Sequence, residues 1–180
     1  MSVEFALNRL DVNCEVTDDF EAIKKADKVI FPGVGEASTT MAFLKEKKLD
    51  ILIKELKQPT LGICLGLQLM CSNSEEGNID CLGIFPEKVL RFEPKLKVPH
   101  MGWNTLTNVK SNLFKREQEN QYVYFVHSYY AEIGENTIAA TNYIVPFSSS
   151  LHRTNFYATQ FHPEKSGDVG AQILKNFIEL

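Results

Sequence analysis

The spacing of apolar residues divides the chain into two halves of different character. In the first half, amphipathic helical segments alternate with short apolar runs, and this alternation predicts a parallel sheet with helices on both faces. Helices are expected at residues 2–10, 19–25, 37–44 and 49–56, and strands at residues 13–16, 28–31 and 60–63.

The second half contains mostly strand-like segments. They are expected at residues 88–92, 122–130, 137–141, 145–149 and 155–161, before a closing helix at residues 168–180. Few helical signals lie between them, so we expect mixed or antiparallel strands wrapped on the edge of the sheet. No repeat or linker divides the sequence. The expected architecture is one three-layer α/β domain over residues 1–180, with a mostly parallel central sheet.

One stretch, Gly62-Ile63-Cys64-Leu65-Gly66, joins an apolar strand directly to a helix. Gly-x-Cys-x-Gly is the thiol counterpart of the Gly-x-Ser-x-Gly nucleophile elbow, in which small neighbours let a strained corner close around the nucleophile. There the sulfur of Cys64 stands at a helix N-terminus, which favours the thiolate, and the N–H of Leu65 can bind an oxyanion. The alternative is a buried structural cysteine between two turn glycines.

A second stretch, Gln160-Phe161-His162-Pro163-Glu164, lies near the end of the chain. A cysteine nucleophile needs a base, and the base needs an acceptor that orients it. His162 can supply the base and Glu164 the acceptor, because Pro163 stiffens the chain between them. The alternative for this stretch is a surface turn with an incidental histidine.

Three candidate stretches follow predicted strands: Pro32-Gly33-Val34-Gly35, the Cys64 corner and the His162 segment. Ligands of open α/β sheets bind beyond the carboxyl ends of the strands, so we expect one shared pocket. The N–H of Gly33 or Val34 is a candidate second oxyanion donor. The alternatives are a plain turn before a helix and a weak phosphate loop, although the full dinucleotide fingerprint is absent.

Composition narrows the function classes. The chain has 180 residues, 44% hydrophobic and 23% charged, with a net charge of −4, which does not favour nucleic acid or an anionic membrane as a partner. No apolar run reaches the ~18 residues of a membrane span, and the N-terminus does not resemble a signal peptide. Four cysteines without disulfide-like spacing predict reduced thiols and a cytoplasmic location. The scattered histidines predict no metal site.

The two chemical stretches resemble the class I (triad-type) glutamine amidotransferases. The likeness runs over essentially the whole chain, and it is greatest to the family of glutaminase subunits of imidazole glycerol phosphate synthase. Three further stretches carry this narrower resemblance: Phe31-Pro32-Gly33-Val34-Gly35, Pro99-His100-Met101-Gly102-Trp103-Asn104 and Tyr124-Phe125-Val126-His127-Ser128-Tyr129.

The resemblance implies a glutaminase that delivers ammonia to a partner. Cys64 is expected to attack the glutamine amide, His162 to protonate ammonia and then activate water, and Glu164 to orient His162. The oxyanion is expected to bind near Leu65 and Gly33. The implied partner, in a heterodimer, is a (β/α)8-barrel cyclase subunit that makes imidazole glycerol phosphate in histidine biosynthesis. No cofactor or metal is expected of this chain.

The resemblance also assigns residues that bind the substrate L-glutamine. Gln68 lies at i+4 from Cys64, on the same side of the helix. Gln68 and Glu76 are expected to hold the glutamine, Glu76 near its α-amino group, and backbone groups of Ser128 and Tyr129 to contact its α-carboxylate. The alternative for Glu76 is a solvated loop charge, and neighbouring Glu75 could be confused with it. The alternative for Ser128 and Tyr129 is an ordinary half-buried aromatic strand.

The partner surface is expected at Trp103, Asn104 and Lys165. Trp103 and Asn104 are predicted to be an exposed aromatic and an exposed amide on a loop, a combination that favours an interface. The alternatives are a packed tryptophan and a solvated lysine. His100 and His127 are interpreted as structural or interface residues that the chemistry does not need.

Two other functions remain open from the sequence. One is the glutaminase of anthranilate, GMP or carbamoyl phosphate synthesis, and the other is a non-catalytic scaffold. A further expectation concerns the start of the chain. The resemblance implies an apolar strand and a glycine-containing turn before the helix that here starts at Ser2, so we expect that Met1 is a late start or a truncation and that a longer form is more stable.

Overall fold

The structure is a computed structural model that describes residues 2–33 and 35–180. Met1 and Val34 lie outside the described residues. The expectation of a late start concerns Met1, and the alternative oxyanion donor is Val34, so both fall outside the described part of the chain. The helices, including the 3₁₀ helices η1 and η2, are α1 (Ser2–Asn8), α2 (Phe20–Lys25), α3 (Ala37–Glu46), α4 (Leu49–Glu55), α5 (Leu65–Met70), η1 (Arg116–Gln118), η2 (Pro163–Lys165) and α6 (Gly167–Ile178).

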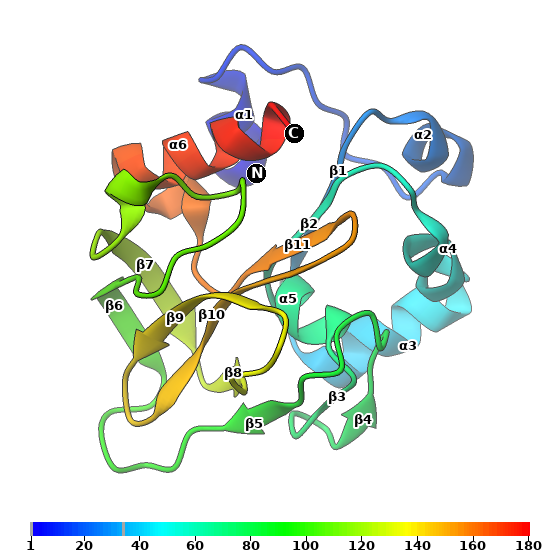
Figure 1. Ribbon diagram of the computed structural model, residues 1–180. Helices are drawn as coiled ribbons and strands as arrows, with labels where there is room; N and C mark the ends of the chain where they lie inside the picture. The colour runs from blue at the N-terminus through cyan, green and yellow to red at the C-terminus, as the bar shows by residue number, and fades with distance from the viewer. Residues whose placement is uncertain (1, 34) are drawn as a thin grey trace.

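Strands in both halves of the chain build the sheets (Figure 1). They are β1 (Val29–Gly33), β2 (Thr60–Cys64), β3 (Asn73–Ser74), β4 (Ile79–Asp80), β5 (Val89–Arg91), β6 (His100–Thr105), β7 (Tyr122–His127), β8 (Tyr129–Ala131), β9 (Thr137–Asn142), β10 (Pro146–Arg153) and β11 (Phe156–Thr159).

The main sheet has the order β1-β2-β11-β10-β8-β5-β3-β4, with β9 paired to β10. Strands β1, β2 and β11 are parallel neighbours, whereas β10 is antiparallel to β11, β9 and β8. Strands β6 and β7 form a separate antiparallel ribbon. The predicted α/β class is confirmed, with parallel strands around Cys64 and antiparallel strands contributed by the second half.

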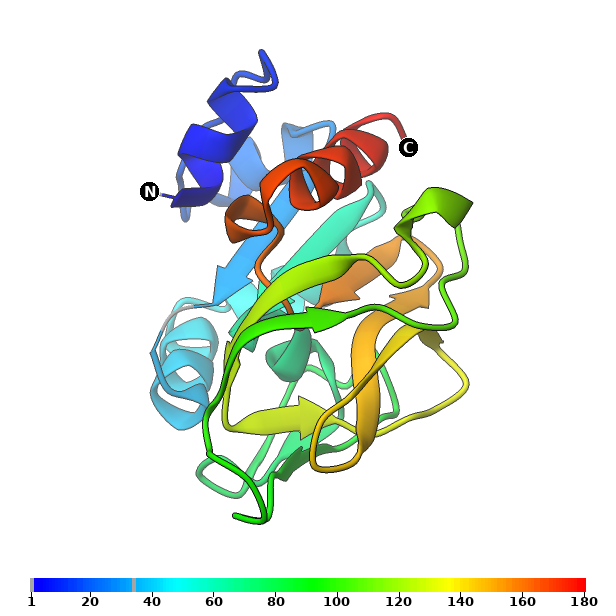
Figure 2. The same ribbon diagram turned by 90° about the vertical axis from the view of Figure 1, so that its left-hand side faces the viewer.

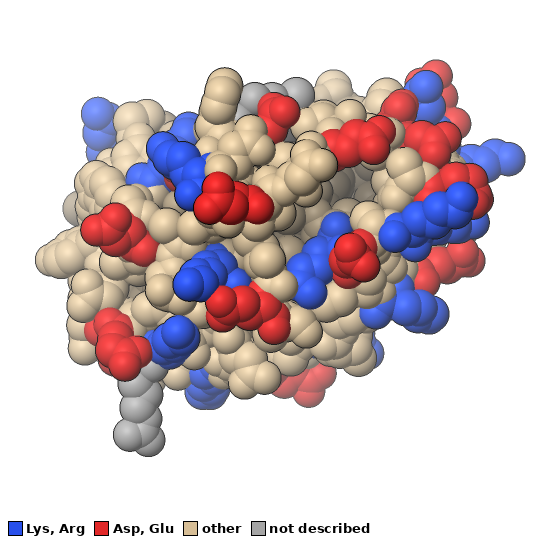
Figure 3. All heavy atoms as spheres, turned by 90° about the horizontal axis from the view of Figure 1, so that it is seen from above, with Lys and Arg blue, Asp and Glu red and all other residues tan. Residues whose placement is uncertain are grey.

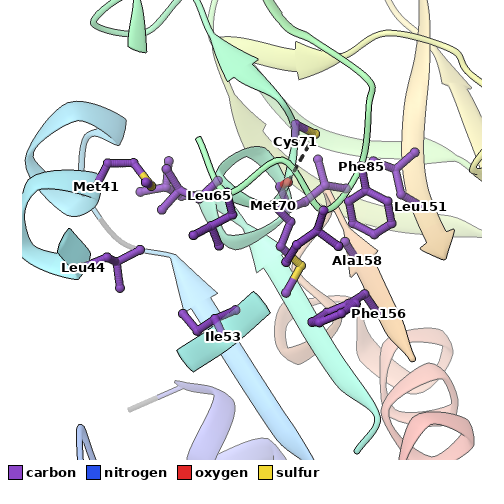
Figure 4. Close-up of a cluster of buried hydrophobic side chains, with 14 of the residues drawn as sticks. Met41, Leu44, Ile53, Leu65, Met70, Cys71, Phe85, Leu151, Phe156 and Ala158 are labelled. Carbon is purple, nitrogen blue, oxygen red and sulfur yellow. Dashed lines mark hydrogen bonds between the residues drawn. The ribbon is translucent and has the colours of Figure 1, made fainter. Parts of the chain in front are cut away.

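Two apolar cores lie on opposite faces of the parallel strands. Leu61 and Ile63 of β2 belong to the core that includes residues of α1 and α6, which lie together in Figure 2. Phe156 and Ala158 of β11 belong to the core with α3, α4 and α5 (Figure 4). Because successive side chains of a strand point to opposite faces, the same strands supply both cores. The result is the expected three-layer arrangement.

The structure differs from the expected elements in three places. Residues 13–16 form no strand, because a strand needs a neighbour to pair its backbone groups and these residues have none within the described ranges. The predicted strand 122–130 is two strands, β7 and β8, which separate at Ser128 and join different sheets. Trp103 and Asn104, expected on a loop, belong to β6.

The surface has no strongly charged face in the view that Figure 3 gives, where acidic and basic side chains are interspersed. Of the helices that the structure describes, none has both the length and the apolar character needed to cross a membrane.

Candidate active site

Cys64 occupies a strained corner between β2 and α5. Its backbone has φ 54° and ψ −107°, a region that non-glycine residues rarely adopt. The flanking glycines are required by close packing: a Cβ on Gly66 would overlap the carbonyl oxygen of Phe31, and one on Gly62 would lie 2.9 Å from the Gly66 carbonyl carbon. The predicted elbow geometry is confirmed.

The two predicted oxyanion donors flank this corner. Gly33 is the register partner of Cys64 in the parallel pair β1–β2. Leu65 is the first residue of α5, and the N–H groups of a first helical turn have no partner within the helix. A Cβ on Gly33 would overlap the Leu65 side chain, so glycine alone lets the two segments approach. Gly33 and Leu65 therefore lie close together beside the Cys64 corner.

His162 and Glu164 form a close pair at the start of η2. His162 Nδ1 lies 2.8 Å from Glu164 Oε1, and the two side chains are only 13% and 3% exposed. Because a carboxylate can only accept, Nδ1 carries the proton in this contact, and Nε2 is not engaged by Glu164. Burial acts to lower the pKa of His162, but hydrogen bonds and charge from Cys64 and Glu164 raise it to about 9. A pKa near 9 keeps His162 largely protonated at neutral pH.

Ser166 ties His162 to the β6–β7 ribbon. Its hydroxyl donates to the carbonyl oxygen of His162 (2.6 Å) and accepts from the N–H of Tyr124 (2.9 Å), and the N–H of His162 donates to the Tyr124 carbonyl (2.9 Å). Ser166 is 1% exposed. The sequence does not reveal this role, because the partner Tyr124 is distant in the chain. The only local signal is the position of Ser166 directly after Glu164 and Lys165.

Two further groups surround the Cys64 sulfur. The carbonyl oxygen of Val126 on β7 lies 3.9 Å from Sγ, and the amide nitrogen Nε2 of Gln160 lies 3.8 Å from it. Gln160 Oε1 accepts from Gln68 Nε2 at 3.1 Å. Gln160 belongs to one of the quoted stretches, but no role was assigned to it from the sequence.

The structure brings some predicted substrate residues together. Gln68 is buried, and its amide nitrogen donates to the carbonyl oxygen of Tyr129 over 2.9 Å. The carbonyl of Ser128 accepts from the N–H of Phe92. The carboxylate of Glu76 is held at the start of α3, where its Oε2 accepts from the N–H of Ala37, 2.9 Å away.

The predicted partner residues lie on β6 and η2. Trp103 is 54% exposed, and Lys165 is exposed. Asn104 differs from the expected exposed loop amide: it is in β6, its Nδ2 donates to the Asn142 carbonyl (2.9 Å), and its Oδ1 accepts from the N–H of Thr105 (2.8 Å). The ribbon pairing places this amide against the end of β9, where its hydrogen bonds are made within the chain.

His100 and His127 form a buried pair behind the site. His100 Nδ1 lies 3.0 Å from His127 Nε2, and His127 Nδ1 lies 2.7 Å from the Tyr129 carbonyl oxygen. Burial lowers the pKa of His127 to about 3 and that of His100 to about 4. Both rings are therefore neutral at physiological pH.

Other features of the described residues do not define a competing site. No group of three or more His, Cys, Asp or Glu side chains gathers in a way that could hold a metal ion within residues 2–33 and 35–180. A surface hollow of about 350 Å³ contains none of the triad residues. Its lining mixes charged side chains with apolar ones from several strands and loops.

Comparison with known proteins identifies the class. The sequence pattern of the family Glutamine amidotransferase class-I matches residues 1–180, and the chain belongs to this family. The crystal structure of a glutamine amidotransferase, 18% identical, superposes with a TM-score of 0.76 over 99% of this chain and 91% of its own, which shows the shared fold.

Relatives of higher identity have one name in common. The chain is 63% identical to the imidazole glycerol phosphate synthase subunit HisH of Bacteroides fragilis, over 99% of this chain and 93% of that protein. It is 46% identical to the subunit of the same name from Buchnera aphidicola, again over 99% and 93%.

Proposed function

We propose that this chain is the glutaminase subunit of imidazole glycerol phosphate synthase and supplies ammonia to a cyclase subunit in histidine biosynthesis. The proposal is carried by two observations: Cys64 stands at a strained strand-to-helix corner, and His162 lies 2.8 Å from Glu164 with a pKa that Cys64 and Glu164 raise. The high identity to relatives named as HisH subunits supports the particular enzyme. The four cysteines are free, which fits a reducing, cytoplasmic setting.

The proposed mechanism uses a covalent thioester. The Cys64 thiolate attacks the side-chain amide carbon of glutamine, and the N–H groups of Leu65 and Gly33 bind the resulting oxyanion. His162 donates a proton to the departing ammonia, and then takes a proton from the water that hydrolyses the γ-glutamyl thioester to glutamate. Glu164 keeps His162 in the required tautomer throughout.

The proposed substrate contacts come from Gln68, Glu76, Ser128 and Tyr129. The hydrogen bond between Gln68 and the Tyr129 carbonyl supports a shared pocket for two of them. Glu76 uses one carboxylate oxygen to accept from Ala37 N–H, and in this proposal its carboxylate also binds the glutamine α-amino group. Glu76→Gln should then raise KM for glutamine and leave the stability of the fold nearly unchanged. An unchanged KM contradicts this assignment.

The β6–β7 ribbon supports the proposed position of the cyclase. Its outward face carries three apolar side chains that are more than half exposed: Met101, Trp103 and Tyr122. On the same ribbon, the Val126 carbonyl contacts the Cys64 sulfur and the Tyr124 carbonyl accepts from His162. A partner bound to this face, with Lys165 at its border, would press on the strand that contacts the Cys64 sulfur and the backbone of His162.

The nucleophile is tested by Cys64→Ala with Cys81→Ala as its matched control. Burial raises the pKa of Cys81 to about 11, so this thiol is unreactive at neutral pH. Cys64→Ala should abolish glutamine hydrolysis, while the cyclase complex still turns over with added ammonia. Cys81→Ala should hydrolyse glutamine at the wild-type rate. Hydrolysis by Cys64→Ala near the wild-type rate would make Cys64 structural.

The partner surface is tested by Trp103→Glu. Ile51 on α4 is a control of similar exposure, at 51%, away from the ribbon. Trp103→Glu should reduce copurification with the cyclase and cyclase-stimulated glutamine hydrolysis, because it places a charge in a desolvated contact. Ile51→Glu should do neither. Equal copurification and equal stimulated hydrolysis in the two variants would show that the ribbon is not part of the interface.

A further inference from the structure

Gln160 is a buried residue that the proposed reaction does not use. Its side chain is fully enclosed, and its backbone N–H donates to the Ser149 carbonyl over 2.9 Å. Its amide nitrogen Nε2 lies 3.8 Å from the Sγ of Cys64, within reach of an N–H···S hydrogen bond. An enclosed amide that contacts the nucleophile is in a position to control it.

Gln68 determines which end of the Gln160 amide faces the sulfur. Gln68 Nε2 can only donate, and it donates to Gln160 Oε1 (3.1 Å) and to the Tyr129 carbonyl oxygen (2.9 Å). If the Gln160 amide turned over, two NH₂ groups would face each other and its carbonyl oxygen would face the sulfur. The hydrogen bonds therefore hold the donor end toward Cys64.

The histidine pair holds the Tyr129 carbonyl in turn. Since a carbonyl only accepts, His127 Nδ1 carries the proton in the 2.7 Å contact with it. His127 Nε2 is then the acceptor for His100 Nδ1 at 3.0 Å, and His100 Nε2 faces the Asn104 amide nitrogen at 3.3 Å. Neutral rings satisfy every one of these contacts with a single assignment of protons. The carbonyl that anchors Gln68 thus has a fixed position.

We propose that Gln160 is a further residue of the catalytic centre, whose amide N–H donates to the Cys64 thiolate and holds the sulfur in place for attack. This inference rests on the proposed function, in which Cys64 is the attacking group. A hydrogen bond to an anion is stronger than one to a neutral atom, so the contact is strongest while the sulfur is charged and weakens once the thioester forms. Gln68, the Tyr129 carbonyl and the histidine pair are its support.

The test compares three variants. Gln160→Met removes the donor at similar volume, and Gln160→Glu replaces the donor by an acceptor of the same shape. Thr159→Val is the matched control, because Thr159 is adjacent, equally enclosed, and has a hydroxyl without a hydrogen-bond partner in the described part of the chain. The measurements are the rate constant of Cys64 alkylation by iodoacetamide, kcat and KM for glutamine in the cyclase complex, and the thermal midpoint.

Gln160→Met should slow alkylation and lower kcat about tenfold, with KM little changed, because the lost bond is to a charged sulfur and not to the substrate. Gln160→Glu should lose more, and Thr159→Val should behave as wild type. Wild-type alkylation and kcat in Gln160→Met overturn the inference, and so does a lowered thermal midpoint without slower alkylation of the folded protein.

A second variant leaves Gln160 in place, so the inference can be tested even if substitution of Gln160 disturbs the fold. Gln68→Met frees the Gln160 amide to turn over, so alkylation should again be slower, and an unchanged alkylation rate overturns the inference. Glutamine hydrolysis that survives in Cys64→Ala contradicts the proposed function instead, whatever the Gln160 variants show. The two failures are therefore distinguishable.

Discussion

His162 and His127 have the same side chain and opposite electrostatic environments. His162 faces a carboxylate and a thiol, and despite its burial these raise its pKa to about 9. His127 faces a carbonyl oxygen and another histidine, and burial lowers its pKa to about 3. Burial acts to lower the pKa of both rings, and only at His162 do the partners outweigh it. Anionic partners make a histidine an acid–base catalyst, and neutral partners make it a fixed hydrogen-bonding group.

The largest contrast is expected in catalysis. His162→Gln should lower kcat/KM for glutamine by a factor on the order of 10³, because it removes the proton transfer to ammonia and from water. His127→Gln should lower it by about tenfold at most, since His127 acts only through the Tyr129 carbonyl. Steady-state assays of the cyclase complex compare the two. Equal losses would mean that both histidines serve the same role.

Removal of the carboxylate should make His162 more similar to His127. Glu164→Gln keeps the shape of the side chain and removes its charge, so the pKa of His162 should fall from about 9, and kcat should fall on the order of a hundredfold. Histidine NMR titration measures the first effect and steady-state kinetics the second. A His162 titration that stays near pH 9 in this variant would assign the shift to Cys64 alone.

The two histidines should also give stability opposite dependences on pH. His162 binds a proton more tightly in the folded state, so its stabilising contribution is complete below pH 6.5 and is lost as pH rises toward 9. His127 resists protonation in the folded state, so stability is lost as pH falls from 6.5 toward 3, by about 3 kcal/mol at pH 4.

Denaturant unfolding across this pH range measures both slopes. His127→Gln should reduce the slope on the acid side, to which His100 also contributes, and leave the alkaline side, whereas His162→Gln should reduce the slope on the alkaline side only. If one substitution flattens both sides, the opposite assignment of the two rings is wrong.

The smallest effect is expected at the surface. Lys165→Ala should change the free energy of unfolding by no more than about 0.5 kcal/mol, because the side chain is exposed. It should still weaken the stimulation of glutamine hydrolysis by the cyclase. Lys54→Ala on α4 is a control with a like charge at another position. Equal stimulation of the two variants would exclude Lys165 from coupling.

Sequence reasoning succeeded where the signal was local. The Cys64 corner was predictable because two glycines flank it between an apolar strand and a helix, and α6 was predictable from the spacing of Ile173 and Phe177. The ordering of His162 by Glu164 also required only neighbouring residues. These features depend on local geometry, which the order of residues expresses directly.

The features that the sequence did not reveal depend on distant partners. Strand β6 has a glycine at φ 134° in its middle and is a strand only because β7 pairs with it. Asn104 was expected to be exposed because its acceptor at Asn142 is far along the chain. Residues 13–16 have a strand-like composition but pair with no strand among residues 2–33 and 35–180. The role of Gln160 is visible only once Gln68 and Cys64 lie beside it.

The most direct test of the central claim is to find which residue a glutamine-like electrophile modifies. The cyclase complex is treated with the electrophile, and the labelled peptide is identified by mass spectrometry in wild type, His162→Gln and His127→Gln. The triad predicts a single label on Cys64, formed at nearly the wild-type rate in His127→Gln and far more slowly in His162→Gln. A label on Cys14, Cys71 or Cys81, or a label on Cys64 whose rate is independent of His162, would contradict it.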